Sequence, residues 1–211
     1  MTALRVRAYI DGLNLFYGSL KGKPELKWLD VVKLVDALIP DASVEHVRYF
    51  SAPVSGKIDP RCPVRQEIYL RALRTLPRFS DHMGRFRSHP VDMPLAAPAP
   101  GSPRLVKVIK TEEKGSDVNL ATYLLIDGMD GLYDEALVIS NDSDLVEPIA
   151  TANHRFGPVH VVRPNNQYNG QVAAAATSYH PIPNGLIASC QLPSIIHLKN
   201  GKTVTRPLEW T

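Results

Sequence analysis

The segment 135–140, which reads Glu-Ala-Leu-Val-Ile-Ser, places the tightest constraint on the fold of this chain. It is almost wholly apolar and lacks the alternation expected of a strand with one solvent-exposed face. Such a segment is typical of a strand that is buried on both faces of a parallel sheet. Parallel strands are joined by crossover connections, which are usually helices. We therefore expect strands and helices to alternate along the chain.

Apolar spacing elsewhere in the sequence supports this expectation. It predicts strands at 5–11, 44–51, 85–91, 105–110, 135–140 and 159–162, and helices at 28–39, 64–76, 116–126, 145–153 and 172–177. Their order predicts an α/β fold with a mainly parallel sheet and helices on both faces. The proline-rich insert 94–103 is expected to form a stiff surface loop between two of the strands.

The regular pattern ends near Pro181, which divides the chain into a domain, 1–180, and a C-terminal extension, 181–211. Segments 195–198 and 203–205 predict a β-hairpin in this extension, with its turn at Asn200-Gly201. An isolated hairpin is at best marginally stable in water, so the apolar side chains of the extension must pack against another surface. That surface is either the chain's own domain or a second copy of the chain, and the second alternative predicts a homodimer.

Composition excludes several classes of protein. The chain is 44% hydrophobic and 21% charged, which excludes a disordered or fibrous protein. Cys62 and Cys190 are far apart in the sequence, so neither a disulfide scaffold nor a zinc site is expected. No signal peptide and no apolar run of about 18 residues is present, which predicts a cytoplasmic protein without a membrane partner. The balance of 24 Lys+Arg and 21 Asp+Glu means that a nucleic-acid site must come from local clustering.

Acidic residues stand at the ends of the predicted elements. Asp11 ends the first strand, Asp142 and Asp144 follow the strand 135–140, and Asp117 opens a helix. In an open α/β sheet, ligands bind beyond the carboxyl ends of the strands, where the strand order reverses. Carboxylates gathered there repel each other unless a cation neutralises them, and oxygen ligands suit Mg²⁺ or Mn²⁺. Each aspartate taken alone also fits the role of a turn former or a helix N-cap.

Three blocks of the sequence resemble the signature motifs of NYN-domain proteins. They are Ile-Asp-Gly-Leu-Asn-Leu at 10–15, Glu-Lys-Gly-Ser-Asp-Val at 113–118 and Leu-Val-Ile-Ser-Asn-Asp-Ser-Asp-Leu at 137–145. The resemblance is to the LabA-like bacterial branch of this family, which is related to the PIN-domain nucleases, and it covers about residues 5–180. It implies a three-layer α/β/α PIN-like sandwich that holds a divalent metal and cleaves RNA.

Carried over by position, the resemblance implies four metal-holding carboxylates and one polar partner. The metal-binding and catalytic carboxylates are Asp11, Asp117, Asp142 and Asp144, and the polar partner that orients the site is Asn14. The wider PIN pattern contains a further glutamate that has no clear counterpart here, although Glu112 and Glu113 are nearby. The sequence therefore leaves a second metal site open.

Candidate substrate-binding residues fall into two groups. Beside the acidic blocks stand Lys114, Ser140, Asn141 and Ser143, and within an arginine-rich stretch, 61–87, stand Arg71 and Arg74. Arginine-rich surfaces bind phosphates, so RNA is the expected partner. A solvated helix face explains the arginines equally well, and serine beside a helix start is usually a cap.

These residues predict a Mg²⁺- or Mn²⁺-dependent ribonuclease, a hydrolase in which metal-activated water attacks phosphorus. Phosphodiester hydrolysis needs a nucleophilic water and a stabilised leaving oxygen, and bound metal supplies both. Two alternatives stay open: a non-catalytic RNA-binding or regulatory protein, and a metal-dependent phosphatase. A deep basic groove at the acidic site would favour the polynucleotide, whereas a small closed pocket would favour the phosphatase.

Overall fold

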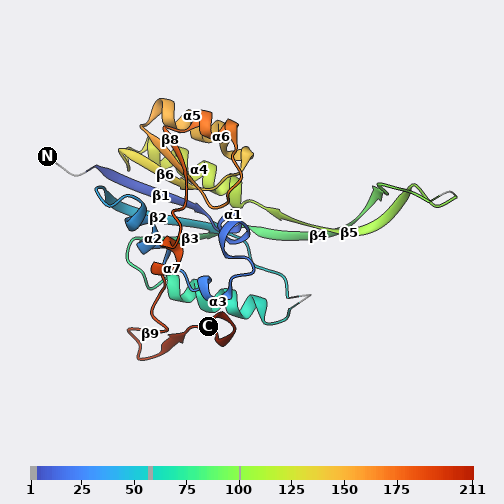
Figure 1. Cartoon of the computed structure of the whole chain (residues 1–211), viewed down its shortest axis with the longest axis horizontal. Coiled ribbons are helices and arrows are strands. Elements are labelled where there is room, and N and C mark those ends of the chain that lie inside the picture. Colours follow the sequence, from blue (N-terminus) through green and yellow to red (C-terminus); the bar gives the residue numbers. More distant parts are fainter. Residues whose placement is uncertain (1–3, 57–58, 100) are drawn as a thin grey trace.

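Six parallel strands form the centre of the molecule in the computed structural model, which describes residues 4–56, 59–99 and 101–211 (Figure 1). Their order across the sheet is β3-β2-β1-β6-β7-β8, and every neighbouring pair is parallel. The strands are β1 (Arg5–Asp11), β2 (Ser43–Ser51), β3 (Phe79–Met83), β6 (Glu135–Ile139), β7 (Val159–Arg163) and β8 (Ser178–Pro181). The mainly parallel sheet predicted from the sequence is therefore confirmed.

Helices cover both faces of the sheet and complete a three-layer α/β/α sandwich. One face packs against α2 (Val31–Leu38), α3 (Cys62–Leu73) and α7 (Leu186–Ser189), and the other against α4 (Ser116–Met129), α5 (Val146–Arg155) and α6 (Gly170–Ala175). The alternation of β1 divides the core, since Ala8 and Ile10 face the first layer and Tyr9 faces the second. Among the described residues, no helix has the length and hydropathy needed to cross a bilayer.

Short helical turns connect several of these elements. They are α1 (Gly12–Leu15), η1 (Phe16–Leu20), η2 (Pro24–Leu26), η3 (Ser143–Leu145) and η4 (Leu208–Trp210). Local sequence sets where the helices begin and end. Asp30 caps α2, because its side chain accepts a 2.9 Å hydrogen bond from the backbone N–H of Lys33, and Pro40 follows the end of the helix.

The strand order reverses at β1. From β1 the chain first builds outward through β2 to β3, and it later returns to the other side of β1 with β6. Ile10 pairs with Ile139, so the carboxyl ends of β1 and β6 lie side by side. This is the topological switch point at which open α/β sheets bind their ligands.

The structure differs from the sequence prediction at both edges of the sheet. The segments Phe79–Met83 and Ser178–Pro181 form the edge strands β3 and β8, neither of which was predicted. Conversely, the strands predicted at 85–91 and 105–110 exist as β4 (Arg85–Pro94) and β5 (Leu105–Lys114), but they lie outside the sheet. They pair only with each other, as an antiparallel hairpin that projects far from the domain (Figure 1).

The C-terminal extension folds back on its own domain. Its predicted hairpin is confirmed as β9 (Ile195–His197) and β10 (Thr203–Thr205), which lies against α3. Val204 is buried in the core, and the ring of Trp210 lies 6.2 Å from that of Trp28. Val204 and Trp210 thus pack on the chain's own domain, one of the two surfaces considered for the extension, and the homodimer stays a prediction.

Candidate metal centre

Three carboxylates meet at the switch point of the sheet. One oxygen from each of Asp11, Asp117 and Asp142 lies within 4.8 Å of the others. Asp11 is the last residue of β1, Asp117 lies in the first turn of α4, and Asp142 follows β6. The fold thus brings together three of the four aspartates that the sequence singles out.

Asp11 is the most constrained member of this acidic triad. Its Oδ1 accepts a 2.9 Å hydrogen bond from the backbone N–H of Asn14, and its Oδ2 accepts one of 2.9 Å from the Ser140 hydroxyl. The side chain is only 3% exposed, and burial raises its pKa to about 6, although the two hydrogen bonds oppose the shift. The charges of Asp117 and Asp142 raise this pKa further. A bound cation would relieve the cost of ionising the group.

Asp142 acts as a cap while remaining in the triad. Its Oδ1 accepts a 3.0 Å hydrogen bond from the backbone N–H of Asp144, at the start of η3. Asp144 itself is exposed, and its carboxylate is not part of the triad, although its charge helps to raise the pKa of Asp117. The structure therefore does not place Asp144 as a fourth member of the triad.

Glu113 is a site residue that the sequence could not distinguish from Glu112. Its Oε1 accepts a 3.1 Å hydrogen bond from the backbone N–H of Ser116, and its charge raises the pKa of the half-buried Asp117, after burial and Asp142. Glu112 points elsewhere and pairs with lysines of the hairpin. Successive strand residues face opposite sides, so only one of the two can reach the site. Gly115, at φ +106°, then turns the chain into α4.

Asn14 and Asn141 link the loops around the triad. The Oδ1 of Asn14 accepts a 3.1 Å hydrogen bond from the backbone N–H of Asn141, so Asn14 has the orienting position that the sequence predicts. The Asn141 amide donates to the Oδ1 of Asn165 at 2.9 Å and to the backbone oxygen of Gln167 at 3.0 Å. Its Oδ1 accepts from the hydroxyl of Tyr179 at 2.6 Å. Asn141 therefore holds these loops together, and the substrate contact predicted for it stays a prediction.

The remaining predicted substrate residues divide by their distance from the triad. Ser140 is buried beneath Asp11, whereas Ser143 is exposed beside the site. Lys114 is exposed and lines a separate depression with Arg85, and its Nζ lies 3.6 Å from a carboxylate oxygen of Glu112. Of these three residues, only Ser140 contacts a triad carboxylate.

Arg71 and Arg74 do not converge on the triad. Both belong to the end of α3, which covers the face of the sheet opposite to α4. The guanidinium of Arg74 already binds Asp81 at 2.7 Å and Glu67 at 3.2 Å. The substrate-binding role predicted for the two arginines is therefore not supported by their position.

The triad opens onto a cavity of about 560 Å³. Its lining includes the triad together with Leu13, Asn14, Tyr17, Gly18, Glu113, Ser116, Asn165 and Gln167. None of the described lysines and arginines lines it, so the deep basic groove expected for a polynucleotide is absent from this wall. The cavity is also an open groove, unlike the small closed pocket expected for a phosphatase.

An aromatic pocket of about 390 Å³ lies beside this groove and shares Leu13 and Tyr17 with it. Six aromatic side chains line the pocket: Phe16, Tyr17, Tyr49, Tyr69, Phe86 and Trp210. Gly12 permits this packing, because a Cβ there would lie 2.4 Å from the Tyr49 ring. The aromatic residues of this pocket come from segments that are distant in the sequence, so no local motif indicates it.

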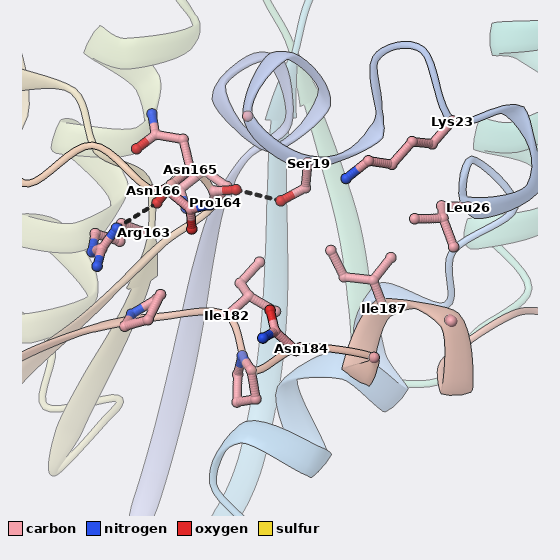
Figure 2. A pocket seen from close by; sticks show the side chains of 15 residues that line it. Ser19, Lys23, Leu26, Arg163, Pro164, Asn165, Asn166, Ile182, Asn184 and Ile187 are labelled. Carbon is pink, nitrogen blue, oxygen red and sulfur yellow. Dashed lines mark hydrogen bonds between the residues drawn. The ribbon is translucent and has the colours of Figure 1, made fainter.

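A third cavity, of about 190 Å³, adjoins the acidic groove at Gly18, and Figure 2 shows the side chains that line it. The side chain of Lys23 points into it, and Asn165 lines both this cavity and the acidic groove. The hydroxyl of Ser19 donates to the backbone oxygen of Pro164, and Arg163 donates to that of Asn165 at 2.7 Å. These bonds fix the loop that forms one wall of the metal centre.

Comparison with known proteins places these features in context. No protein-family model matches the chain, so the resemblance to NYN-domain proteins stays a prediction. The chain is 29% identical to the 6-hydroxy-3-succinoylpyridine 3-monooxygenase HspA of Pseudomonas putida, across 98% of this chain and 75% of that protein. The chain is thus similar in sequence to an enzyme.

A solved structure shares the fold. It is a protein of unknown function from Vibrio parahaemolyticus, with a TM-score of 0.54 and 16% sequence identity. The likeness covers 86% of this chain and 94% of that protein. At this level of identity the likeness concerns the architecture alone.

Proposed function

We propose that this chain is a divalent-metal-dependent ribonuclease that hydrolyses RNA phosphodiester bonds. The observation that carries the proposal is the triad of Asp11, Asp117 and Asp142, with oxygens within 4.8 Å of one another at the switch point of the sheet. Carboxylates at this separation repel each other, and a cation between them removes the repulsion. An all-oxygen set is suited to Mg²⁺ or Mn²⁺.

The chain's own residues prepare the site for this chemistry. A divalent cation bound there would supply a Lewis acid for the phosphoryl group and lower the pKa of an attacking water. Ser140 and the backbone of Asn14 fix both oxygens of Asp11, and Asp142 is held by its capping bond to Asp144. Because these contacts exist before substrate arrives, little reorganisation accompanies the reaction.

The shape of the site favours a polymer over a small phosphate ester. The triad faces an open groove of about 560 Å³, which does not enclose a small ligand. A phosphatase for small esters would instead enclose its substrate, because enclosure provides most of the contacts to a small ligand. The phosphatase alternative therefore has less support than the nuclease.

Metal-dependent cleavage of fluorescent RNA by the full chain tests the proposal. We expect cleavage with Mg²⁺ or Mn²⁺, none with EDTA, and at least a hundredfold loss in Asp142→Asn. The matched control is Asp144→Asn, which removes a neighbouring carboxylate from outside the triad. RNA that is bound but uncleaved with every metal would refute the nuclease and support the non-catalytic alternative.

A second candidate function is oxygenation of a pyridine-type aromatic ring. The relative from Pseudomonas putida is named for this activity, and the aromatic pocket beside the triad has the size and lining for such a ring. Lys27 is a cationic member of its wall and would fix an anionic substituent of the ring.

Two reactions of the same chain, RNA cleavage and hydroxylation of the pyridine substrate, distinguish the nuclease from the oxygenase. A monooxygenase inserts one atom of O₂ into its substrate and reduces the other to water, which requires a two-electron donor. The chain is incubated with 6-hydroxy-3-succinoylpyridine, O₂ and such a donor, and oxygen uptake and hydroxylated product are measured. Turnover of this substrate with RNA left intact would replace the nuclease proposal by the oxygenase.

A further inference from the structure

The hairpin of β4 and β5, which we call the arm, is the most exposed element of the molecule. Its ten cross-strand pairs run from Arg85 opposite Lys114 to Pro94 opposite Leu105. At about 3.3 Å per residue, the paired strands extend for about 30 Å. Figure 1 shows the arm projecting away from the layers of the domain. A two-stranded hairpin of this kind is marginally stable alone, so a binding partner would stabilise it.

The arm carries the whole net charge of the chain. Segment 85–114 contains six basic residues, Arg85, Arg87, Arg104, Lys107, Lys110 and Lys114, and three acidic ones, Asp92, Glu112 and Glu113. The complete chain has 24 Lys+Arg and 21 Asp+Glu, which leaves 18 of each outside the arm. The net excess of positive charge in the sequence therefore falls within this one segment.

Successive residues of a strand face opposite sides, and this alternation places four of the six basic residues on one face of the arm. Arg85, Arg87, Lys110 and Lys114 share this face, with Glu112 as its one carboxylate. Glu112 lies 2.6 Å from the Nζ of Lys110 and 3.6 Å from that of Lys114. This surface, which we call the basic face, thus has four cations and one carboxylate, and the carboxylate is paired with two of the cations.

Arg85 and Lys114 stand directly opposite each other at the base of the arm. Like charges in this position destabilise a strand pair. Both side chains are exposed and line a surface depression of about 400 Å³ together with Asn119 of α4. An anion bound between these two side chains would remove the repulsion between them. We therefore expect this pair to bind a phosphate group.

The base of the arm also forms part of the metal centre. On the side opposite to the basic face, Glu113 lines the acidic groove, and Phe86 and Thr111 line the aromatic pocket. Because Glu113 is next to Lys114 in the sequence, the groove and the basic face adjoin only at the base of the arm, on opposite sides of the strand pair. The groove itself lacks cations among its described lining residues, so it needs a neighbouring surface to hold a polyanion.

We propose that the basic face of the arm binds the sugar-phosphate backbone of RNA. This inference rests on the proposed ribonuclease function and names the surface that holds its substrate. Arginine and lysine side chains spaced along an extended strand neutralise successive phosphates and release counterions. Arg74, at the end of α3, is a poorer candidate, because it is already paired with two carboxylates, Asp81 and Glu67, whereas the four cations of the basic face have only Glu112.

The test compares two variants of the full chain that lose the same number of charges. The arm variant carries Arg85→Gln, Arg87→Gln, Lys110→Gln and Lys114→Gln. The control variant carries Arg71→Gln, Arg155→Gln, Lys199→Gln and Lys202→Gln, which are exposed residues outside the arm. Binding of a fluorescent single-stranded RNA is measured by anisotropy with EDTA at several salt concentrations, so that cleavage does not interfere.

We expect the arm variant to bind RNA at least tenfold more weakly at low salt. The slope of log affinity against log salt should fall by about 3, because each lost phosphate contact removes about 0.7 from it. The control variant should keep both the affinity and the slope. A second arm variant, Arg85→Lys with Arg87→Lys, keeps the charge and should bind as the parent does. Unchanged binding in the four-residue arm variant, or an equal loss in the control, overturns the proposal.

Hydrolysis of bis(4-nitrophenyl) phosphate separates this inference from the proposed function. The ester is too small to span the groove and the basic face, so its metal-dependent hydrolysis reports on the triad alone. If the ester is hydrolysed but the arm variant binds RNA as tightly as the parent chain, the proposed role of the arm is wrong and the proposed metal chemistry is retained. If RNA binding depends on the arm but neither substrate is cleaved, the arm is confirmed and the nuclease is wrong.

Discussion

The hydroxyl of Ser140 donates a 2.9 Å hydrogen bond to the Oδ2 of Asp11, and this contact joins the ends of β1 and β6 where the strand order reverses. The same oxygen of Ser140 accepts a 3.2 Å hydrogen bond from the backbone N–H of Asp142. Because both Ser140 and Asp11 are buried, this geometry is not disturbed by solvent. A single hydroxyl group therefore positions two of the three triad residues.

Ser140→Ala should weaken Mn²⁺ binding by tenfold or more while the chain still folds. The hydroxyl orients a metal-binding carboxylate, and the loss of such a partner costs 10- to 100-fold in metal affinity. Isothermal titration with Mn²⁺ measures the effect. Ser143→Ala is the control, because Ser143 is exposed beside the same loop and should leave the affinity unchanged. Equal affinities in the two variants would show that Ser140 has no positioning role.

Asp142→Asn should raise the melting temperature of the metal-free chain. The substitution keeps the shape and the capping oxygen of the side chain, but it removes one of three repelling charges. Added Mn²⁺ should stabilise the parent chain much more than the variant, since ligand binding stabilises only a state that holds the ligand. Differential scanning fluorimetry with and without metal checks both statements. A metal response in Asp142→Asn equal to that of the parent chain would remove Asp142 from the site.

The raised pKa of Asp11 predicts how stability depends on pH. Its value of about 6 in the folded chain exceeds the ordinary value of 3.8, so the folded state holds this proton more tightly than the unfolded state. The contribution of this group to stability is complete below pH 3.8 and is lost as the pH rises through 6. At neutral pH without metal, Asp11→Asn should therefore be more stable than the parent, by at most about 3 kcal/mol.

Urea unfolding between pH 4 and pH 7 measures this difference. The advantage of Asp11→Asn should be largest near neutral pH and should shrink toward pH 4, because the folded-state carboxyl is protonated there and the unfolded-state carboxyl is close to its pKa of 3.8. Saturating Mn²⁺ should cancel the advantage, because the parent then gains the energy of the bound cation. A stability difference that is the same at both pH values would show that the carboxyl of Asp11 does not titrate in this window.

The central sheet and its helices could be predicted from the sequence, because the apolar patterns that indicate them each lie within one element. The apolar run at β6 and the helical spacing of α2 reflect burial within one element, and the aspartates at the strand ends share one sheet edge by topology. The edge strands were not accessible in the same way. The segment Phe79–Met83 is polar at its centre, and it becomes a strand because Val47 to Ser51 of β2 offers it a ladder of hydrogen bonds.

The site was predictable in its acidic residues and unpredictable in its surroundings. Asp11, Asp117 and Asp142 follow from motif and topology, but the exclusion of Asp144 depends on the turn of η3. The direction in which a strand side chain faces separates Glu113 from Glu112, and this requires the register of the arm. The position of Arg71 and Arg74 relative to the triad was not predictable, because the number of arginines in a segment does not reveal which face of the sheet its helix covers.

Asp127→Ala should destabilise the chain by about 3–5 kcal/mol. Asp127 is 2% exposed and binds Arg7 at 3.0 Å and Arg48 at 2.8 Å, and its Oδ2 accepts a 2.9 Å hydrogen bond from Tyr9. Its removal leaves two largely buried guanidinium groups without their carboxylate. The exposed pair of Arg5 and Asp134 provides the control, since Asp134→Ala should cost at most about 1 kcal/mol. Chemical denaturation gives both values, and similar costs would show that the buried network contributes little.

The extension should stabilise its own domain without holding two chains together. Trp210 packs 5.9 Å from the ring of Tyr69 and close to Trp28, whose indole Nε1 donates a 2.9 Å hydrogen bond to the backbone oxygen of Pro193. Deletion of residues 184–211 exposes this aromatic cluster, and each large apolar side chain that loses its burial forfeits about 1.5–3 kcal/mol.

We therefore expect the truncated chain to melt at a markedly lower temperature, with an unchanged number of chains per particle in sedimentation. Trp210→Ala alone should cost about 2 kcal/mol, because the ring is only partly buried. Leu208→Ala in the same turn is the control, since Leu208 is 83% exposed and should be neutral. A parent chain that sediments as a dimer and a truncated chain that sediments as a monomer would show that the extension serves a second copy. An unchanged melting temperature would instead show that its packing on the domain contributes nothing to stability.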